Sequence, residues 1–237
     1  MILYVNGDSH AAAAEAVNPH AFAEDDSKYF YMGRAPHPDN IAVSWGKLLA
    51  DKLKAAFHCG AESGSSNKRI IRTTKEWIDA HQSDLHRTLI VIGWSTWERD
   101  EWLIDGEYYQ VNASGADSVP PEHEQRYKEF IMSLGRFKQG HRIQAAHEMI
   151  FEFHEYLRER DIKHIFFNGN NHFETITNHY DWHGSYINPY DSGNTYSAIL
   201  EKNGFETVSP TSWHFGKTAH SFWSRFVLQY CIDNHFV

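Results

Sequence analysis

The chain has 237 residues, of which 41% are hydrophobic and 15% aromatic, and this is enough to build one well-packed domain. Such a composition excludes a disordered chain, a collagen-like repeat and a small disulfide-stabilised scaffold. The 22 Lys and Arg residues against 31 Asp and Glu residues give a formal net charge of −9. We therefore expect no nucleic-acid partner, because an acidic surface repels phosphate backbones.

Cysteine content and hydropathy bear on the compartment. Cys59 and Cys231 are the two cysteines, and their apolar surroundings predict buried thiols in a reducing compartment. The longest apolar runs are far shorter than the roughly 20 residues that span a bilayer, and Met1 leads into a strand-like run without the basic flank of a signal peptide. We expect a cytoplasmic protein (in the host cytoplasm or the virion if viral) without a membrane partner; the oligomeric state stays open.

Strand-like and helix-like segments alternate along the chain. Short apolar runs that end in small or polar residues are typical of buried parallel strands. In the segments between them, apolar residues recur at spacings of three and four residues, which is typical of amphipathic helices. This alternation predicts a doubly wound α/β domain with a parallel five-stranded sheet, in which ligands bind beyond the carboxyl ends of the strands. The predicted strands are 2–5, 55–59, 89–92, 164–168 and 204–208, and the predicted helices are 41–53, 68–81, 122–159 and 217–234.

Three long segments interrupt this alternation, at 18–40, 94–121 and 170–196. They are rich in Asn, Asp, Gly, Pro and aromatic residues, and they are long for connecting loops. We expect them to form rim or lid structure on a single domain that covers residues 1–237.

Polar residues follow the first strand and precede the last helix. Ser9, in the run Asn6-Gly7-Asp8-Ser9-His10, is predicted at a strand-to-helix turn, where a hydroxyl lies near backbone N–H groups and suits a nucleophile. A plain turn or helix cap explains the same residues. His214 lies in the loop before the last helix, from which an imidazole reaches the same edge of the sheet and acts as a general base for Ser9.

The second and third strands are followed by further candidates. Gly64 brings a bare N–H close to a ligand, and Asn67 either donates its side-chain amide or caps the next helix. Ser95 follows the third strand, and Arg99 binds a carboxylate if its side chain points inward.

In this order, the residues resemble the sequence blocks of the SGNH/GDSL hydrolase superfamily, over nearly the whole chain. The resemblance implies a flavodoxin-like three-layer α/β/α sandwich, with Ser9 as the nucleophile and the N–H groups of Ser9 and Gly64 as oxyanion donors. The blocks are Gly7-Asp8-Ser9, Gly64, Gly93-Trp94-Ser95-Thr96 and His214, and the run 64–70 together with Ser44-Trp45 ahead of Leu48 and Leu49 is similar to SGNH-like proteins of phages.

Two blocks depart from the pattern of this superfamily. The third block usually reads Gly-x-Asn-Asp, so the asparagine donor is replaced by Ser95 or by Asn67 from the neighbouring loop; loss of one donor costs roughly two to three decades in rate. Thr211 stands where the family has an aspartate three residues before the histidine, so Thr211 or a backbone carbonyl is left to orient His214. The candidate catalytic residues are therefore Ser9, His214, Asp8 and Thr211.

Aromatic residues and histidines supply the remaining candidates. His10 lines the pocket or lies on the surface, and Trp94, Trp97 and Trp213 either stack on a sugar ring or pack the loops. His179 and His183 are spaced as metal ligands on a helix. Asn178, Gly184 and Pro189 argue against a helix there, so we expect neither a metal nor a cofactor.

Four functions are compatible with these residues. The first is a serine esterase that hydrolyses a small acyl ester, such as an acetyl ester, on a small-molecule or carbohydrate substrate. The second is a carbohydrate-binding or virion structural protein that kept the fold and lost the chemistry. The third is an O-acyltransferase, which uses the same residues but excludes water. The fourth is a phosphate-binding site at 64–68, with Lys68 and Arg69 beside helix-start N–H groups.

Overall fold

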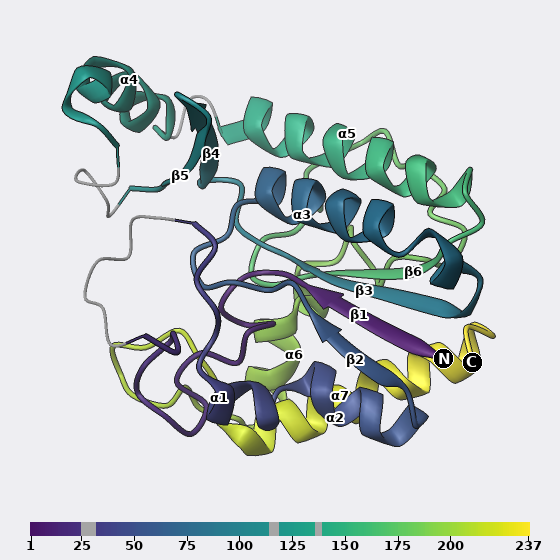
Figure 1. Ribbon diagram of the computed structural model, residues 1–237. Coiled ribbons are helices and arrows are strands. Elements are labelled where there is room, and N and C mark those ends of the chain that lie inside the picture. The colour runs from purple at the N-terminus through teal and green to yellow at the C-terminus, as the bar shows by residue number, and fades with distance from the viewer. Residues whose placement is uncertain (25–31, 114–118, 136–138) are drawn as a thin grey trace.

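The computed structural model describes residues 1–24, 32–113, 119–135 and 139–237 (Figure 1). Its centre is a sheet of four parallel strands in the order β2-β1-β3-β6, which is the flavodoxin-like order without its fifth strand. The register places Leu3 of β1 opposite Phe57 of β2 and Leu89 of β3. The strands are β1 (Ile2–Asn6), β2 (Ala56–Cys59), β3 (Thr88–Trp94) and β6 (Lys163–Asn168).

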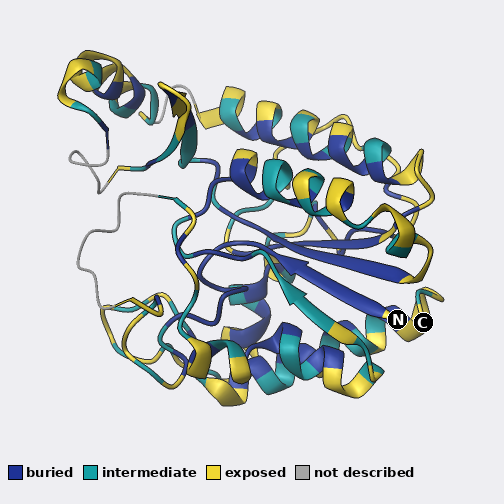
Figure 2. Ribbon diagram, in the orientation of Figure 1, coloured by how far each residue is buried: buried dark blue, intermediate teal, exposed yellow. Residues whose placement is uncertain are grey.

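Helices cover both faces of this sheet, which confirms the three-layer prediction (Figure 1). Successive strand residues point to opposite faces, so Leu3 and Val91 pack against one helical layer while Tyr4 and Ile90 pack against the other. One layer holds α2 (Trp45–Leu53), α6 (Tyr196–Lys202) and α7 (Lys217–Asp233), and the other holds α3 (Asn67–Ala80) and α5 (Gln139–Arg158). Figure 2 shows the strands β1, β3 and β6 almost wholly buried between these layers.

Side-chain caps fix where these helices begin. The Ser44 hydroxyl accepts the Lys47 N–H at the start of α2, and the Ser66 hydroxyl accepts the Arg69 N–H at the start of α3. A capping hydroxyl satisfies one of the N–H groups that the first turn leaves free. Because Ser66 is the cap of α3, the Asn67 side chain is released for another contact. The short elements are α1 (Pro38–Ala42), η1 (Gln82–Arg87) and η5 (Ser192–Asn194).

The insertion after β3 forms a small structure of its own. It contains the antiparallel hairpin of β4 (Asp100–Ile104) and β5 (Glu107–Val111), followed by η3 (Pro121–His123) and α4 (Glu124–Ser133). Trp102, Val111 and Phe130 form a hydrophobic cluster between the hairpin and α4. The predicted helix 122–159 is therefore wrong: α4 packs on the hairpin and α5 packs on the sheet, so two helices with different partners replace one.

The predicted fifth strand at 204–208 is also wrong. Only an isolated bridge between Thr207 and Phe215 forms there, and Gly204, Glu206 and Val208 are exposed. A strand buried in a sheet would hide these side chains. The position beside β6 is taken by the third insertion, since the Phe166 N–H donates to the Ser185 carbonyl at 2.7 Å and the Ile187 N–H to the Phe166 carbonyl at 2.9 Å.

Both cysteines are free thiols, Cys231 buried and Cys59 half-buried. Burial raises the pKa of the Cys59 thiol to about 11 and that of Cys231 to about 12. They are therefore protonated and unreactive at neutral pH. Within the described ranges, none of the helices has both the length and the apolar character needed to cross a bilayer.

Candidate functional site

The turn after β1 places Ser9 at the carboxyl end of the sheet, as predicted. A Cβ on Gly7 would lie 2.7 Å from the Ala11 Cβ and 2.8 Å from the Gly93 carbonyl oxygen, so only glycine allows the chain to turn this tightly. Ser9 is 6% exposed. Neither its hydroxyl nor its N–H forms a hydrogen bond within the part of the chain that the structure describes, which leaves both groups uncommitted.

His214 is held by a carboxylate that the sequence did not indicate. The Nδ1 atom of His214 lies 2.9 Å from Glu15 Oε2, and the Ser212 hydroxyl donates to the same carboxylate and accepts the His214 N–H. Burial opposes ionisation of Glu15, but the bonds from Ser212 and His214 outweigh it and lower its pKa. Glu15 is therefore a carboxylate at neutral pH, oriented towards an imidazole nitrogen.

This arrangement corrects the predicted role of Thr211. Thr211 is exposed, and its hydroxyl contacts Ser209 rather than His214. Glu15 escaped prediction because it lies 199 residues from His214 in the chain, whereas the family pattern seeks the acid in the same loop. Ala13 and Glu15 both have positive φ, so the chain after the alanine run turns sharply instead of continuing as a helix.

Two further histidines, His10 and His220, lie near His214. The His10 ring lies 5.7 Å from the His214 ring, centroid to centroid, and the Asn170 amide contacts His10 Nε2 at 3.2 Å. The His220 Nδ1 accepts the Trp45 N–H at 3.3 Å. Burial lowers the pKa of His10 to about 4 and that of His220 to about 3, so both are neutral at pH 7 and His10 is enclosed rather than on the surface.

Asp8 carries a compensated buried charge. Its Oδ2 accepts the Ser95 hydroxyl at 2.9 Å and the Arg99 guanidinium at 3.0 Å, and its Oδ1 accepts the His10 N–H at 3.0 Å. Burial would raise the pKa of Asp8, but these neighbours together lower it. The interpretation that Arg99 binds a carboxylate when it points inward is confirmed, and Asp8 serves to hold the turn rather than to face a substrate.

Two of the predicted oxyanion donors are used inside the protein. The Asn67 side chain accepts the Ser95 N–H at 2.8 Å and donates to the Ser95 carbonyl at 3.1 Å, and the Ser95 hydroxyl donates to Asp8. Both side chains therefore have partners within the protein. At Gly64, where φ is +84°, an added Cβ would meet the Gln110 side chain of β5, and both residues line a cavity of about 480 Å³. The Gly64 N–H itself makes no hydrogen bond to any of the described residues.

The predicted phosphate site and one predicted aromatic contact are also corrected. Lys68 pairs with Asp100, and Arg69 pairs with Glu62, so carboxylates already hold both cations. Trp94 is 1% exposed and belongs to the core, which excludes it from binding a substrate.

The other two tryptophans differ from Trp94 and from each other. Trp97 is largely buried and stacks on Phe173 with centroids 5.2 Å apart. Trp213 is 78% exposed and directly precedes His214. Of the three predicted tryptophans, only Trp213 thus presents an open aromatic face beside the candidate base.

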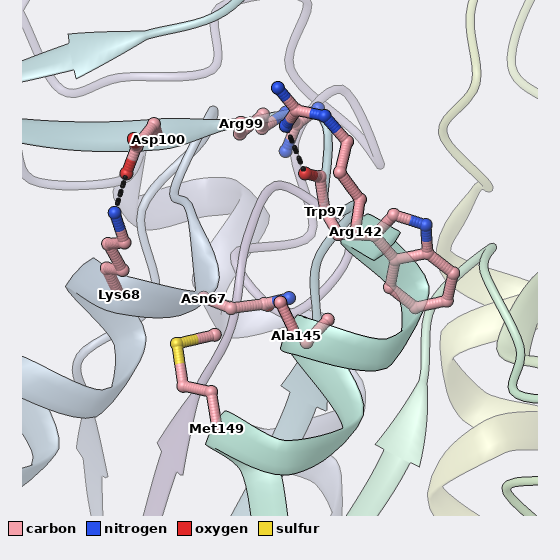
Figure 3. Close-up of a pocket in the computed structure, with 9 residues that line it drawn as sticks. Asn67, Lys68, Trp97, Arg99, Asp100, Arg142, Ala145 and Met149 are labelled. Atoms are coloured by element: carbon pink, nitrogen blue, oxygen red, sulfur yellow. Dashed lines mark hydrogen bonds and ion pairs between the residues drawn. The ribbon is translucent and has the colours of Figure 1, made fainter. Parts of the chain in front are cut away.

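A cavity of about 150 Å³ lies between α3, α5 and the start of the hairpin (Figure 3). Figure 3 shows Lys68 directed towards Asp100 and the Arg142 guanidinium directed towards the Trp97 carbonyl. Arg99 connects this cavity to the Asp8 carboxylate, and it also borders a second cavity, of about 480 Å³, on the hairpin side. Both cavities therefore lie next to Arg99, the residue that binds the Asp8 carboxylate in the turn after β1. The opposite wall of the smaller cavity is formed by Ala145, Ala146 and Met149 of α5.

A family model, described as a family of unknown function (DUF6071), matches residues 37–191, or about two thirds of the chain. The chain belongs to DUF6071. The matched part of this DUF6071 chain contains Asn67, Ser95 and Arg99, whereas Ser9 and His214 lie outside it. No curated protein matches the chain.

Two of the solved structures that are similar to the DUF6071 chain have low sequence identity to it and cover nearly all of it. A lipolytic protein of the G-D-S-L family from Desulfitobacterium hafniense DCB-2 is 13% identical, with 97% of this chain and 99% of that chain covered and a TM-score of 0.38. An acetyl xylan esterase (Est2A) from the rumen bacterium Butyrivibrio proteoclasticus is 14% identical, with 98% of this chain and 63% of that chain covered and a TM-score of 0.45. Both TM-scores are below 0.5, so neither similarity bears on the activity of this chain.

Proposed function

We propose that this protein is a serine esterase in which Ser9 is the nucleophile, His214 the general base and Glu15 the acid that orients the base. The observation that carries the proposal is the 2.9 Å contact between His214 Nδ1 and Glu15 Oε2. A carboxylate at this nitrogen fixes the tautomer and directs the other ring nitrogen outward as a proton acceptor. Glu15 thereby supplies the member that the sequence pattern lacks.

The proposed reaction assigns each of these residues a role. His214 Nε2 takes the Ser9 proton as Oγ attacks the acyl carbon, and the Glu15 carboxylate stabilises the imidazolium. The N–H groups of Ser9 and Gly64, which have no partner among the described residues, are the proposed donors to the oxyanion. His214 returns the proton to the departing alcohol, and water then hydrolyses the acyl-enzyme by the same route in reverse.

The proposed substrate is a small acyl ester, such as an acetyl ester, on a carbohydrate. Trp213 supports this choice, because a 78% exposed indole beside the base offers a flat apolar face to a sugar ring. The clusters of aromatic residues in the insertions do not support it, since Trp97 packs on Phe173 and Tyr180 packs on Phe151.

A non-catalytic binding protein is the second candidate. The observation in its favour is that no Ser9–His214 hydrogen bond forms in the described ranges, while the Asn67 and Ser95 side chains are hydrogen-bonded to protein groups. On this alternative, Glu15 and His214 only link the chain ends.

A serine-directed fluorophosphonate, read by intact mass, separates the two candidates. We expect one label per chain on the wild type, none on Ser9→Ala or His214→Ala, and unchanged labelling of Ser192→Ala, whose serine is half-buried on the η5 turn of the third insertion. Glu15→Gln should slow labelling by roughly two to four decades, because its amide cannot stabilise the imidazolium. If the wild type is folded, as judged by circular dichroism, and takes no label, the esterase proposal is refuted and the binding-protein candidate is left.

A further inference from the structure

A cluster of metal-ligating side chains lies at the edge of the sheet opposite Ser9. His154 and Glu155 come from the last turns of α5, next to the amino end of β6, and His183 comes from the third insertion. One nitrogen or oxygen of each residue lies within 4.8 Å of those of the other two. Because Ser9 follows the carboxyl end of β1, this cluster is remote from the proposed esterase site and independent of it.

The hydrogen bonds around His154 decide which of its nitrogens carries the proton. His164 Nδ1 lies 2.8 Å from the Ile162 carbonyl, to which it must donate, so His164 Nε2 is an acceptor. His154 Nδ1 lies 2.8 Å from that acceptor and therefore donates to it. The proton is thus fixed on Nδ1, and His154 Nε2 carries a free lone pair.

That lone pair has no partner. The His154 side chain is 1% exposed, and its Nε2 is a buried nitrogen without a hydrogen bond among the described residues. It points into the cluster, 3.7 Å from Glu155 Oε1. A buried polar atom without a partner normally costs about 1–3 kcal/mol. A bound cation satisfies it, and a histidine whose other nitrogen donates to a neighbour is the usual form of a metal ligand.

The remaining groups of the cluster fit such an ion. The His183 side chain is 53% exposed, with Asp181 Oδ2 3.3 Å from its Nδ1, so this ring is free to shift towards the other two donors. Donors around tetrahedral zinc are about 3.4 Å apart, as bond lengths of about 2.0–2.1 Å require. Arg158 binds both oxygens of Glu155, at 2.8 and 2.6 Å, but each oxygen keeps a second lone pair for a metal.

We propose that His154, His183 and Glu155 bind one zinc ion, which fastens the third insertion to the end of α5. Two imidazoles and one carboxylate suit a borderline divalent cation such as Zn²⁺ better than Ca²⁺ or Mg²⁺, which prefer oxygen ligands. This proposal departs from the expectation in the sequence analysis that the chain holds no metal. It also differs from the pair considered in the sequence, because His179 stacks on Tyr190 and contacts the Ile176 carbonyl.

The test is competition for Zn²⁺ between a chromophoric chelator and the full chain after treatment with EDTA. We expect one zinc per wild-type chain, and an affinity at least about tenfold lower in His183→Ala and in Glu155→Gln. His86→Ala, which removes an exposed histidine from η1, should bind like the wild type. His183 is largely exposed, so its variant keeps the fold.

Two further readouts identify the ligands. Co²⁺ in the wild type should give the intense visible absorption of a tetrahedral site, which His183→Ala lacks. Zn²⁺ should raise the melting temperature of the wild type and not that of His183→Ala, since an ion stabilises only the state that binds it. Absence of stoichiometric zinc binding, or equal binding by the wild type and the His183 and Glu155 variants, overturns the proposal.

Discussion

His220 makes the stability of this protein sensitive to mild acid. Its imidazole is 1% exposed and accepts the Trp45 N–H, and burial lowers its pKa from 6.5 to about 3. In the unfolded chain the same group has its ordinary pKa of about 6.5. Between these two values the unfolded state binds a proton that the folded state does not, so stability falls as the pH falls.

The size of the effect follows from the two pKa values. At pH 5 the unfolded form gains RT ln(1 + 10^1.5), or about 2 kcal/mol, from protonating this one histidine. The folded form gains almost nothing, because pH 5 lies well above its pKa of about 3. Above pH 6.5 the contribution vanishes. Against a typical total stability of about 5–15 kcal/mol, one such group is readily measured.

The assay is urea denaturation of the wild type and of His220→Gln at pH 7.5 and pH 5. Glutamine keeps an acceptor for the Trp45 N–H but does not titrate. We expect the wild type to lose about 2 kcal/mol more than the variant between the two pH values, whatever their difference at pH 7.5. His86→Gln, at an exposed position, should follow the wild type. Equal losses in the wild type and in His220→Gln would show that the folded protein accommodates a charged His220, and would refute the reasoning.

Three substitutions test other parts of the structure. Arg69→Met removes the cation that pairs with the Glu62 carboxylate, which is 2% exposed and then keeps the N–H groups of Gly33 and Arg34 as hydrogen-bond donors. Because the buried charge loses its counter-charge, we expect a loss of about 3–5 kcal/mol in urea denaturation; a loss below 1 kcal/mol would contradict the buried pair. Gly64→Ala places a Cβ 1.5 Å from Gln110 Nε2 at a φ of +84°, so it should destabilise by about 1–3 kcal/mol, and by less when combined with Gln110→Ala; equal losses would argue against the contact. Trp213→Ala should leave the melting temperature unchanged and raise KM for an acetylated sugar with kcat nearly constant; an unaltered KM would remove the indole from the substrate site.

The four sheet strands were predictable because each is a short apolar run with a polar end. The fifth failed because Phe205 and Val208 look like strand residues but form only the margin of a loop, with Val208 exposed. Strand propensity measures how well a side chain fits a half-buried pleated surface. It does not show whether a neighbouring strand is present, and here the insertion residues 185–187 had taken that place.

The candidate site, like the sheet, was predictable only in part. The positions of Ser9 and His214 in the fold were predictable because the motif follows β1 and the histidine precedes the last helix. Glu15 was not found, since its role depends on the positive φ of Ala13 and Glu15 itself. The contacts of Asn67 depend on a separate cap at Ser66, which frees its amide for the Ser95 backbone. Both are consequences of local backbone geometry that a residue pattern does not encode.

The contact between Glu15 and His214 closes a loop of 199 residues, nearly the whole length of the polypeptide. Because synthesis proceeds from the N-terminus, Glu15 is made early. Its contact with His214 can form only after β3, β6 and most of the helices have been made. Contacts between such distant residues are among the slowest to form. The pair therefore forms only once residue 214 has been made, and a fragment that stops before His214 contains Glu15 without its imidazole partner.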